Sequence, residues 1–230
     1  SSTTIGAKPS SCLSLLKSIK ESKATEAIRK IKTMIKTISF TNNEEIGREI
    51  LGAVKGRPRT EDVEIKLDRI CEEIFEEFVE SSKLSVRVFS EHGDYGDSSP
   101  EYLCSIDPFD GSGLYRRGFE FEWYSVLTFF NLDGNPVVGG AADILKKKLY
   151  LANSEERRCF IKKGGKRLCL SRTRKNVLDN QTIIAAYLMN RDYLLPWVDK
   201  MRDLLNKFPV FIWPNGGSCI YHMIAEGKVH

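Results

Sequence analysis

Two aspartates at the end of an apolar run constrain this chain more than any other feature. The stretch SIDPFDGSG (residues 105–113) continues an apolar run that is typical of a buried strand. Pro108 fixes one backbone angle and Phe109 turns the chain, so the flanking aspartates can face the same space. Asp107 and Asp110 would then repel, and one of them would normally take up a proton. Either the segment is an ordinary Asx turn, or a positive group lies between the carboxylates.

Two further acidic residues favour the second interpretation. Glu91 ends another predicted strand, LSVRVFS (84–90), and the polar loop HGDYGDSSP joins the two strand ends. Asp68 lies on the helix predicted just before that strand. If the strands are neighbours, these acids converge, and a hard divalent cation such as Mg²⁺ removes their repulsion by taking oxygen ligands. Acids at the exits of buried strands therefore indicate a metal site more than a turn.

Hydrophobic periodicity gives the surrounding elements. Helices are predicted over 11–38, from about 43 through 54, over 63–81, over 191–208 with Pro196 in the first turn, and over 218–228 with Ser218 as the cap. The helix over 63–81 shows one apolar face, formed by Val63, Leu67, Ile70, Ile74 and Phe78. Besides 84–90, strands are predicted over 101–106, 123–131, 136–145, 148–154, 158–165, 182–188 and 210–214.

This order of elements predicts an α+β protein. Helices, then antiparallel strands, then alternating strand and helix give helix–sheet–helix layers. We expect an N-terminal α+β lobe over 1–175, which carries the metal site, and a smaller, partial C-terminal α/β lobe over 176–230.

Composition excludes several classes of protein. With 41% hydrophobic and 29% charged residues the chain is globular, and no run of eighteen apolar residues predicts a membrane span. Six scattered cysteines, without CxxC pairs, are typical of reduced thiols in a cytoplasmic protein. Residues 146–175 hold twelve Lys/Arg against two glutamates. This basic stretch is either a solvated hairpin face or a field that attracts phosphorylated substrates. Nucleic acid is not favoured, because few aromatic residues interleave the charges.

The motifs resemble the inositol monophosphatase superfamily of Mg²⁺-dependent, often lithium-sensitive phosphatases, with its fructose-1,6-bisphosphatase and 3'-phosphoadenosine phosphatase relatives. SEHG (90–93), SIDPFDGSGLYRRG (105–118) and the strand pair over 125–152, ending in LYLA, follow the order of that family's Glu-Glu-x-Gly, Asp-Pro-x-Asp-Gly-Thr/Ser and Leu-Tyr-x-Ala elements. KGRPRTEDVEIKLDR (55–69) resembles its lysine loop and following aspartate. The resemblance implies a layered sugar-phosphatase-like fold.

The resemblance also implies roles for single residues. The metal ligands would be Glu91, Asp107, Asp110 and the main-chain carbonyl of Phe109. Asp68 and the Ser112 hydroxyl would position and deprotonate the attacking water. The N–H groups of Gly111 and Ser112 would hold the phosphate. Gly217 and Ser218, in GGSC (216–219), would contact the rest of the substrate, unless this segment is a simple capped helix.

The chain departs from the family in three places. His92 stands where a second Glu is common, and Leu114 where Asn is common. The family's last metal ligand is the Asp of a Trp-Asp-x-Ala motif beyond the Gly-Ser helix, and the 230 residues contain no Trp-Asp pair. We therefore expect a fragment of a longer protein, a lobe completed by another chain, or a degenerate relative.

The function that the resemblance implies is Mg²⁺-dependent hydrolysis of a small phosphomonoester by metal-activated water. Inositol monophosphate and fructose 1,6-bisphosphate are the leading substrate types, followed by 3'-phosphoadenosine phosphates. The alternative is a non-catalytic or degenerate relative that acts as a binding protein. A homodimer without membrane or nucleic-acid partners is expected.

Overall fold

The computed structural model describes residues 29, 33, 44–54, 63–154, 157–163, 166–170, 178–215 and 217–229. Most of the helix predicted over 11–38 lies outside these residues, as do Cys12, residues 55–62 of the lysine-loop segment, residue 216 and the end of the basic stretch from 171 on. In the described part of the chain, no helix is both long and apolar enough to cross a membrane.

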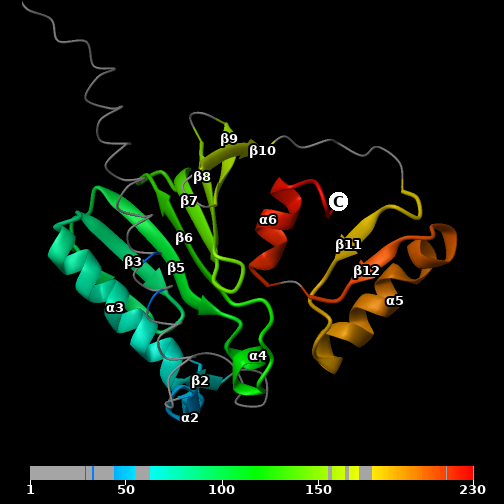
Figure 1. Cartoon of the computed structure of the whole chain (residues 1–230), viewed down its shortest axis with the longest axis horizontal. Helices are drawn as coiled ribbons and strands as arrows, with labels where there is room; N and C mark the ends of the chain where they lie inside the picture. Colours follow the sequence, from blue (N-terminus) through cyan, green and yellow to red (C-terminus); the bar gives the residue numbers. More distant parts are fainter. Residues whose placement is uncertain are drawn as a thin grey trace, which may run out of the picture.

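A large mixed sheet forms the centre of the fold (Figure 1). Eight strands of the described chain pair in the order β10-β9-β8-β7-β6-β5-β3-β4. Neighbours pair antiparallel except β3 and β5, which run parallel. The strand bounds are β3 Val86–Ser90, β4 Gly93–Gly96, β5 Tyr102–Asp110, β6 Tyr124–Phe130, β7 Pro136–Asp143, β8 Lys148–Asn153, β9 Arg158–Lys163 and β10 Lys166–Leu170. The parallel pair places the C-terminal ends of β3 and β5 at the same edge, as the sequence predicted for neighbouring strands.

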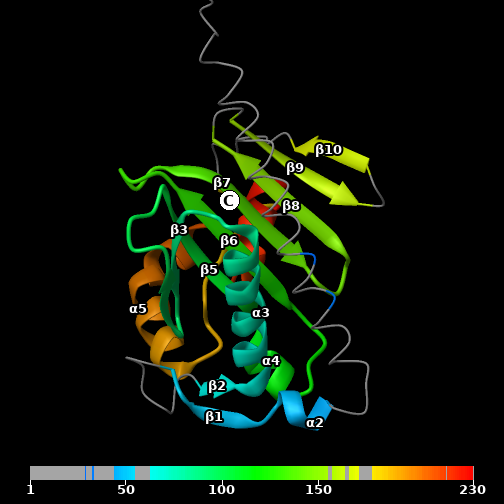
Figure 2. The ribbon, with the colours of Figure 1, turned by 90° about the vertical axis from the view of Figure 1, so that its left-hand side faces the viewer.

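Helix α3 (Lys66–Ser82) covers one face of this sheet (Figures 1 and 2). The main hydrophobic core lies between the helix and the sheet. It includes Leu67, Cys71, Phe75, Phe78 and Val79 from α3 with Val86, Val88, Cys104, Leu127 and Phe129 from the strands.

The buried face of α3 differs from the predicted one. Ile70 and Ile74 are only half-buried, whereas Cys71 and Phe75 are completely buried. This rotation also turns Asp68 and Glu72 inward, where both are buried. The local pattern could not show it, because apolar residues occur on both sides of this helix and the sheet selects one.

The second face of the sheet carries helix α6 (Cys219–Ala225), which packs near β7 and β8. Beyond α6 lies a two-stranded parallel sheet of β11 (Ile183–Ala185) and β12 (Phe211–Trp213), with helix α5 (Arg191–Lys207) outermost. Figure 1 shows the resulting succession of helix, sheet, helix, sheet and helix. The predicted α+β class with helix–sheet–helix layers is confirmed. The boundary near residue 175 stays a prediction.

The segment before α3 is not the long helix that the sequence predicted. Helix α2 spans only Glu44–Gly47, and the chain then forms β1 (Ile50–Ala53), which pairs antiparallel with β2 (Val63–Ile65). Glycine at the fourth position favours an end to the helix there, and pairing with β2 then keeps the following residues extended.

The prediction for Pro196 was wrong. Asn190 caps α5 by accepting the Asp192 N–H at 2.9 Å, so the helix begins at Arg191 and Pro196 falls in its second turn. An interior proline removes one intrahelical hydrogen bond, which this helix tolerates near its start.

Candidate active site

The end of β5 contains the irregularity that builds the site. Asp107 lies opposite Val126 and Asp110 opposite Tyr124, so β5 places one more residue between these pairs than β6 does. Such a bulge changes the alternation of side chains, and it turns both aspartates to the same face of the sheet. Pro108 falls inside the bulge, where its missing N–H disrupts no ladder hydrogen bond.

The aromatic core holds the bulge in place. Phe109 is 2% exposed and packs edge-on against Tyr115 and Trp123, with ring centroids 5.6 and 6.3 Å away. Its N–H donates to Asp107 Oδ1 at 3.1 Å. The side chain of Phe109 therefore faces the α3 side of the sheet, while the aspartates on both sides of it face away.

The pKa of Asp107 depends on the other carboxylates of the site. Burial raises the pKa of Asp107 well above its usual range. The charges of Asp110, Glu91 and Asp68, in that order, raise this pKa further, against a smaller lowering by the Phe109 N–H. Asp110, Glu91 and Asp68, the other acidic residues that the sequence singled out, thus each lie close enough to Asp107 to repel its charge.

The donor set fits a hard cation. Mg²⁺ takes oxygen ligands in octahedral geometry, and usually keeps several waters beside one or two carboxylates. Among the residues that the structure describes, no group of three His, Cys, Asp or Glu side chains is close enough together to hold a metal ion by itself. The acids therefore suit a cation that binds mostly through water and substrate oxygens rather than a protein cage.

Asp68 lies in the first turn of α3, as its third residue. Its Oδ2 accepts the Ile65 N–H at 2.9 Å, so the carboxylate stabilises the first turn of the helix. The residue is 4% exposed. Its orientation is therefore fixed by the helix start, and a catalytic role is compatible with this structural one.

Glu91 follows β3 directly, and the residues around it fix its position. The Ser90 hydroxyl donates to Glu72 Oε2 at 2.7 Å, and the His92 N–H donates to Ser90 Oγ at 3.0 Å. The His92 ring lies beside Glu91, with Nε2 3.6 Å from Oε1. The sequence did not predict Glu72 or Ser90 here. The spacing of four residues, which places Asp68 and Glu72 on one face of the same helix, is the signal that could have found Glu72.

Asp110 connects the large sheet to α6. Its Oδ2 accepts the Ser218 N–H at 2.6 Å, across 108 positions of sequence. Ser218 precedes the first residue of α6, but its side chain makes no capping hydrogen bond, contrary to the prediction. A Cβ on Gly217 would stand 3.1 Å from the same Asp110 oxygen, so glycine permits this close approach. The structure thus brings Gly217 and Ser218 to the carboxylate cluster.

Gly111 and Ser112 begin the short helix α4 (Ser112–Arg116). Gly111 has φ +113°, and a Cβ there would lie 2.5 Å from the Glu122 carbonyl oxygen. The N–H groups at a helix start have no partner within the helix. The backbone at Gly111 and Ser112 therefore presents donors next to the Asp110 carboxylate.

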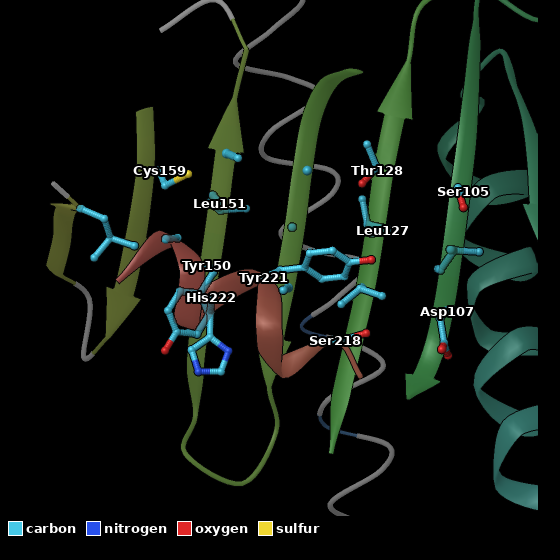
Figure 3. A pocket seen from close by; sticks show the side chains of 18 residues that line it. Ser105, Asp107, Leu127, Thr128, Tyr150, Leu151, Cys159, Ser218, Tyr221 and His222 are labelled. Carbon is cyan, nitrogen blue, oxygen red and sulfur yellow. The ribbon is translucent and has the colours of Figure 1, made fainter. Parts of the chain in front are cut away.

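A cavity of about 440 Å³ extends from the cluster between α6 and the sheet (Figure 3). The floor of the cavity is the sheet itself, where residues of the five strands β5 to β9 lie side by side. One row of paired residues across these strands consists of Ser105, Thr128, Gly139, Ala152 and Cys159. Asp107 lies at one end of the cavity and Cys159 at the other (Figure 3). The small side chains leave this space open beside the site.

His222 lies against this cavity, stacked on two tyrosines. Its ring centroid is 4.6 Å from Tyr150 and 5.4 Å from Tyr124. Burial lowers the pKa of His222 to about 4, although the charges of Glu226 and Asp143 raise it. The imidazole is therefore neutral near pH 7.

Fold and site together define a layered α+β protein with acidic residues at the ends of parallel strands. No protein-family model and no curated protein matches the sequence. The structure is similar to extragenic suppressor protein SuhB of Bartonella henselae, with TM-score 0.69 and 14% identity over 92% of this chain and 76% of that one.

Two further solved structures agree. One is described as an inositol monophosphatase–fructose 1,6-bisphosphatase (TM-score 0.66, 21% identity, 91% of this chain and 73% of that one). The other is an inositol monophosphatase II of Staphylococcus aureus with bound inositol monophosphate (TM-score 0.64, 16% identity, 92% and 71%), also solved with 2'AMP. The chain has the fold of the inositol monophosphatases, as the sequence resemblance predicted.

Proposed function

We propose that this chain hydrolyses a small phosphomonoester in a Mg²⁺-dependent reaction. The observation that carries the proposal is the convergence of carboxylates: the β5 bulge turns Asp107 and Asp110 to one face, and the parallel β3–β5 pair brings Glu91 to the same edge of the sheet. The charges of Asp110, Glu91 and Asp68 raise the pKa of Asp107 beyond the effect of burial, which agrees with this convergence. Half-buried carboxylates that repel one another destabilise the folded state, and a bound cation offsets this cost. Clustered acids at a strand end are thus better explained by function than by stability.

In this proposal Glu91, Asp107, Asp110 and the Phe109 carbonyl hold the cation. When bound, Mg²⁺ lowers the pKa of a water, polarises the phosphoryl oxygens and stabilises the leaving oxygen. Asp68 and the Ser112 hydroxyl orient the attacking water and accept its proton.

The backbone N–H groups of Gly111 and Ser112 donate to the phosphate oxygens. Gly217 and Ser218 approach the same space, where the N–H of Ser218 already meets Asp110. We assign them to the alcohol part of the substrate. Inositol monophosphate and fructose 1,6-bisphosphate are the substrate types we favour, and the similar proteins named above support that choice.

The experiment is phosphate release from inositol monophosphate, fructose 1,6-bisphosphate, 3'-phosphoadenosine 5'-phosphate and 2'-AMP, with Mg²⁺ and with chelator. We expect Mg²⁺-dependent release that Asp107→Asn abolishes. Asp133→Asn is the matched control, because Asp133 is exposed in the β6–β7 turn, at the opposite end of β6 from the site. Release that persists in chelator, or equally in Asp107→Asn, would contradict the proposal.

A binding protein without catalysis is the second candidate. It is favoured by the absence, among the described residues, of three side chains close enough to hold an ion, and by Asp110 being engaged with Ser218. Calorimetry with the same phosphomonoesters separates the two functions. Binding without phosphate release at any Mg²⁺ concentration would establish the second candidate and exclude the first.

Cytoplasmic location and a homodimer also stay proposals. The cysteines in the described part of the chain (71, 104, 159, 169 and 219) are free thiols, which suits a reducing compartment. Light scattering on the purified chain tests the dimer.

A further inference from the structure

His92 is the residue at which this chain departs most clearly from the pattern around its cluster of acids. Its side chain is 4% exposed, and its two ring nitrogens face two carboxylates. Nδ1 lies 3.5 Å from Glu64 Oε1, and Nε2 lies 3.6 Å from Glu91 Oε1. The ring thus fills the space between a residue of β2 and the residue that follows β3.

The Glu64 end of this bridge is fixed. Arg69, in the first turn of α3, donates from Nε to Glu64 Oε1 at 2.8 Å, and its Nη2 lies 2.7 Å from the same oxygen. Both contacts go to one carboxylate oxygen, and charge-assisted contacts of this kind anchor the oxygen that also faces His92. The side chain of Glu64 is only 12% exposed, so water competes little for it.

The backbone of His92 is also fixed. Its N–H donates to Ser90 Oγ, which in turn donates to the buried Glu72 of α3. The backbone of His92 is therefore anchored to α3, and a rotation of the imidazole away from Glu91 would also break its contact with Glu64 of β2. Among the three bridged side chains, that of Glu91 is the most exposed, at 26%, and it lies at the end that solvent reaches.

We infer that His92 is a positioning residue for Glu91, and that it fixes the carboxylate for cation binding by linking it to the Glu64–Arg69 pair. This inference rests on the proposed function. A neutral imidazole has a single N–H, which Nε2 can direct toward Glu91, while the contact of the ring with Glu64 holds its orientation. A glutamate at position 92 could not make this link, because it would add a charge that repels both neighbours.

Two isosteric variants separate the two ends of the bridge. In His92→Gln the amide reaches the position of Nε2, toward Glu91. In His92→Asn it reaches only the position of Nδ1, toward Glu64. If His92 acts in folding alone, both variants should change the affinity for the metal ion to a similar extent. If His92 positions Glu91, only His92→Gln should retain the affinity of the wild type.

The test measures the binding of Mn²⁺, used in place of Mg²⁺, to the full 230-residue chain. The electron paramagnetic resonance signal of the unbound ion reports how much Mn²⁺ remains free. Residues that orient a metal ligand typically contribute about 10- to 100-fold to affinity. We expect His92→Ala and His92→Asn to weaken Mn²⁺ binding by about 10-fold or more, and His92→Gln to stay within about 3-fold of the wild type. Melting temperatures in chelator should match within a few degrees, and Asp133→Asn should bind as the wild type does.

The outcomes distinguish the inference from the proposed function. If the wild type binds Mn²⁺ and Asp107→Asn does not, but all three His92 variants bind as tightly as the wild type, the inference is wrong and the proposed site stands. Equal weakening by asparagine and glutamine would also overturn it, since the link to Glu91 would then not matter. If the wild type binds no Mn²⁺, the proposed function and the inference both fail.

Discussion

The buried imidazole of His222 predicts a specific loss of stability in mild acid. Burial lowers the pKa of His222 to about 4, against about 6.5 for an exposed histidine. Between these values the unfolded chain binds the proton and the folded chain does not, so the free energy of unfolding falls as the pH falls. The contribution is complete above about pH 6.5 and is lost as the pH drops to 4.

Linkage gives the magnitude. With these two pKa values, lowering the pH from about 7.5 to 5 removes about 1–2 kcal/mol, where the upper value is the full linkage. The ring is 6% exposed, so solvent screens it little. For a chain of this size the loss corresponds to about 2–8 °C in melting temperature.

His222→Phe is the perturbation that isolates this effect. Phenylalanine keeps a flat ring between Tyr124 and Tyr150 but cannot be protonated. It also removes Nδ1, a buried atom without a hydrogen-bond partner in the described structure. The charged neighbours stay the same in both proteins: Asp143, Lys146, Glu226 and Lys228.

The assay is urea unfolding of both proteins at about pH 7.5, 6 and 5. We expect the wild type to lose about 1–2 kcal/mol more than His222→Phe over this range. Proton NMR should give a midpoint near 4 for the histidine resonance that the variant lacks. Parallel loss of stability in the two proteins, or a midpoint near 6.5, would refute the reasoning.

Three further predictions concern the site. Asp107→Asn should abolish Mg²⁺-dependent phosphate release. In chelator it should leave the melting temperature unchanged or raised, because it relieves the repulsion between carboxylates. A loss of several degrees by calorimetry would show that Asp107 is a structural residue. Ser112→Ala should lower kcat by about 10²-fold with little change in KM, since it removes a group that orients water but no proposed ligand; an unchanged kcat in steady-state assays would exclude that role. Gly111→Ala should lower the free energy of unfolding by more than about 2 kcal/mol in urea, because φ is +113° and the added Cβ would lie 2.5 Å from the Glu122 carbonyl oxygen. The control Gly113→Ala should be near neutral, because the atom nearest to its added Cβ is 3.5 Å away.

The sequence predicted the neighbourhood of the site well because its signals are local. Glu91 and Asp107 each follow or end an apolar run, and strand ends that share an edge bring such residues together. The fold class followed from the order of elements. The roles of these residues stay predictions, since their chemistry is not tested by geometry alone.

Contacts between distant segments were beyond that reasoning. The link from His92 to Glu64 and the hydrogen bond from Ser218 to Asp110 depend on how β2 and α6 pack, which no local periodicity encodes. The last strand of the large sheet, β10, was missed for a similar reason. Its residues KRLCL show little alternation, and pairing with β9 makes them a strand.

The bulge at Pro108 shows why the motif has its spacing. In a regular strand, residues three apart point to opposite faces, so Asp107 and Asp110 would be separated by the sheet. One extra residue on β5 turns both to the α6 face, and Phe109 anchors the bulge in the aromatic core on the α3 face. The same geometry that brings the charges together also leaves Asp107 half-buried and raises its pKa, which is unfavourable for an ionised carboxylate. A turn selected for stability alone would place at least one of these charges in solvent. The spacing is therefore best understood as a device that holds two carboxylates on one face for a cation.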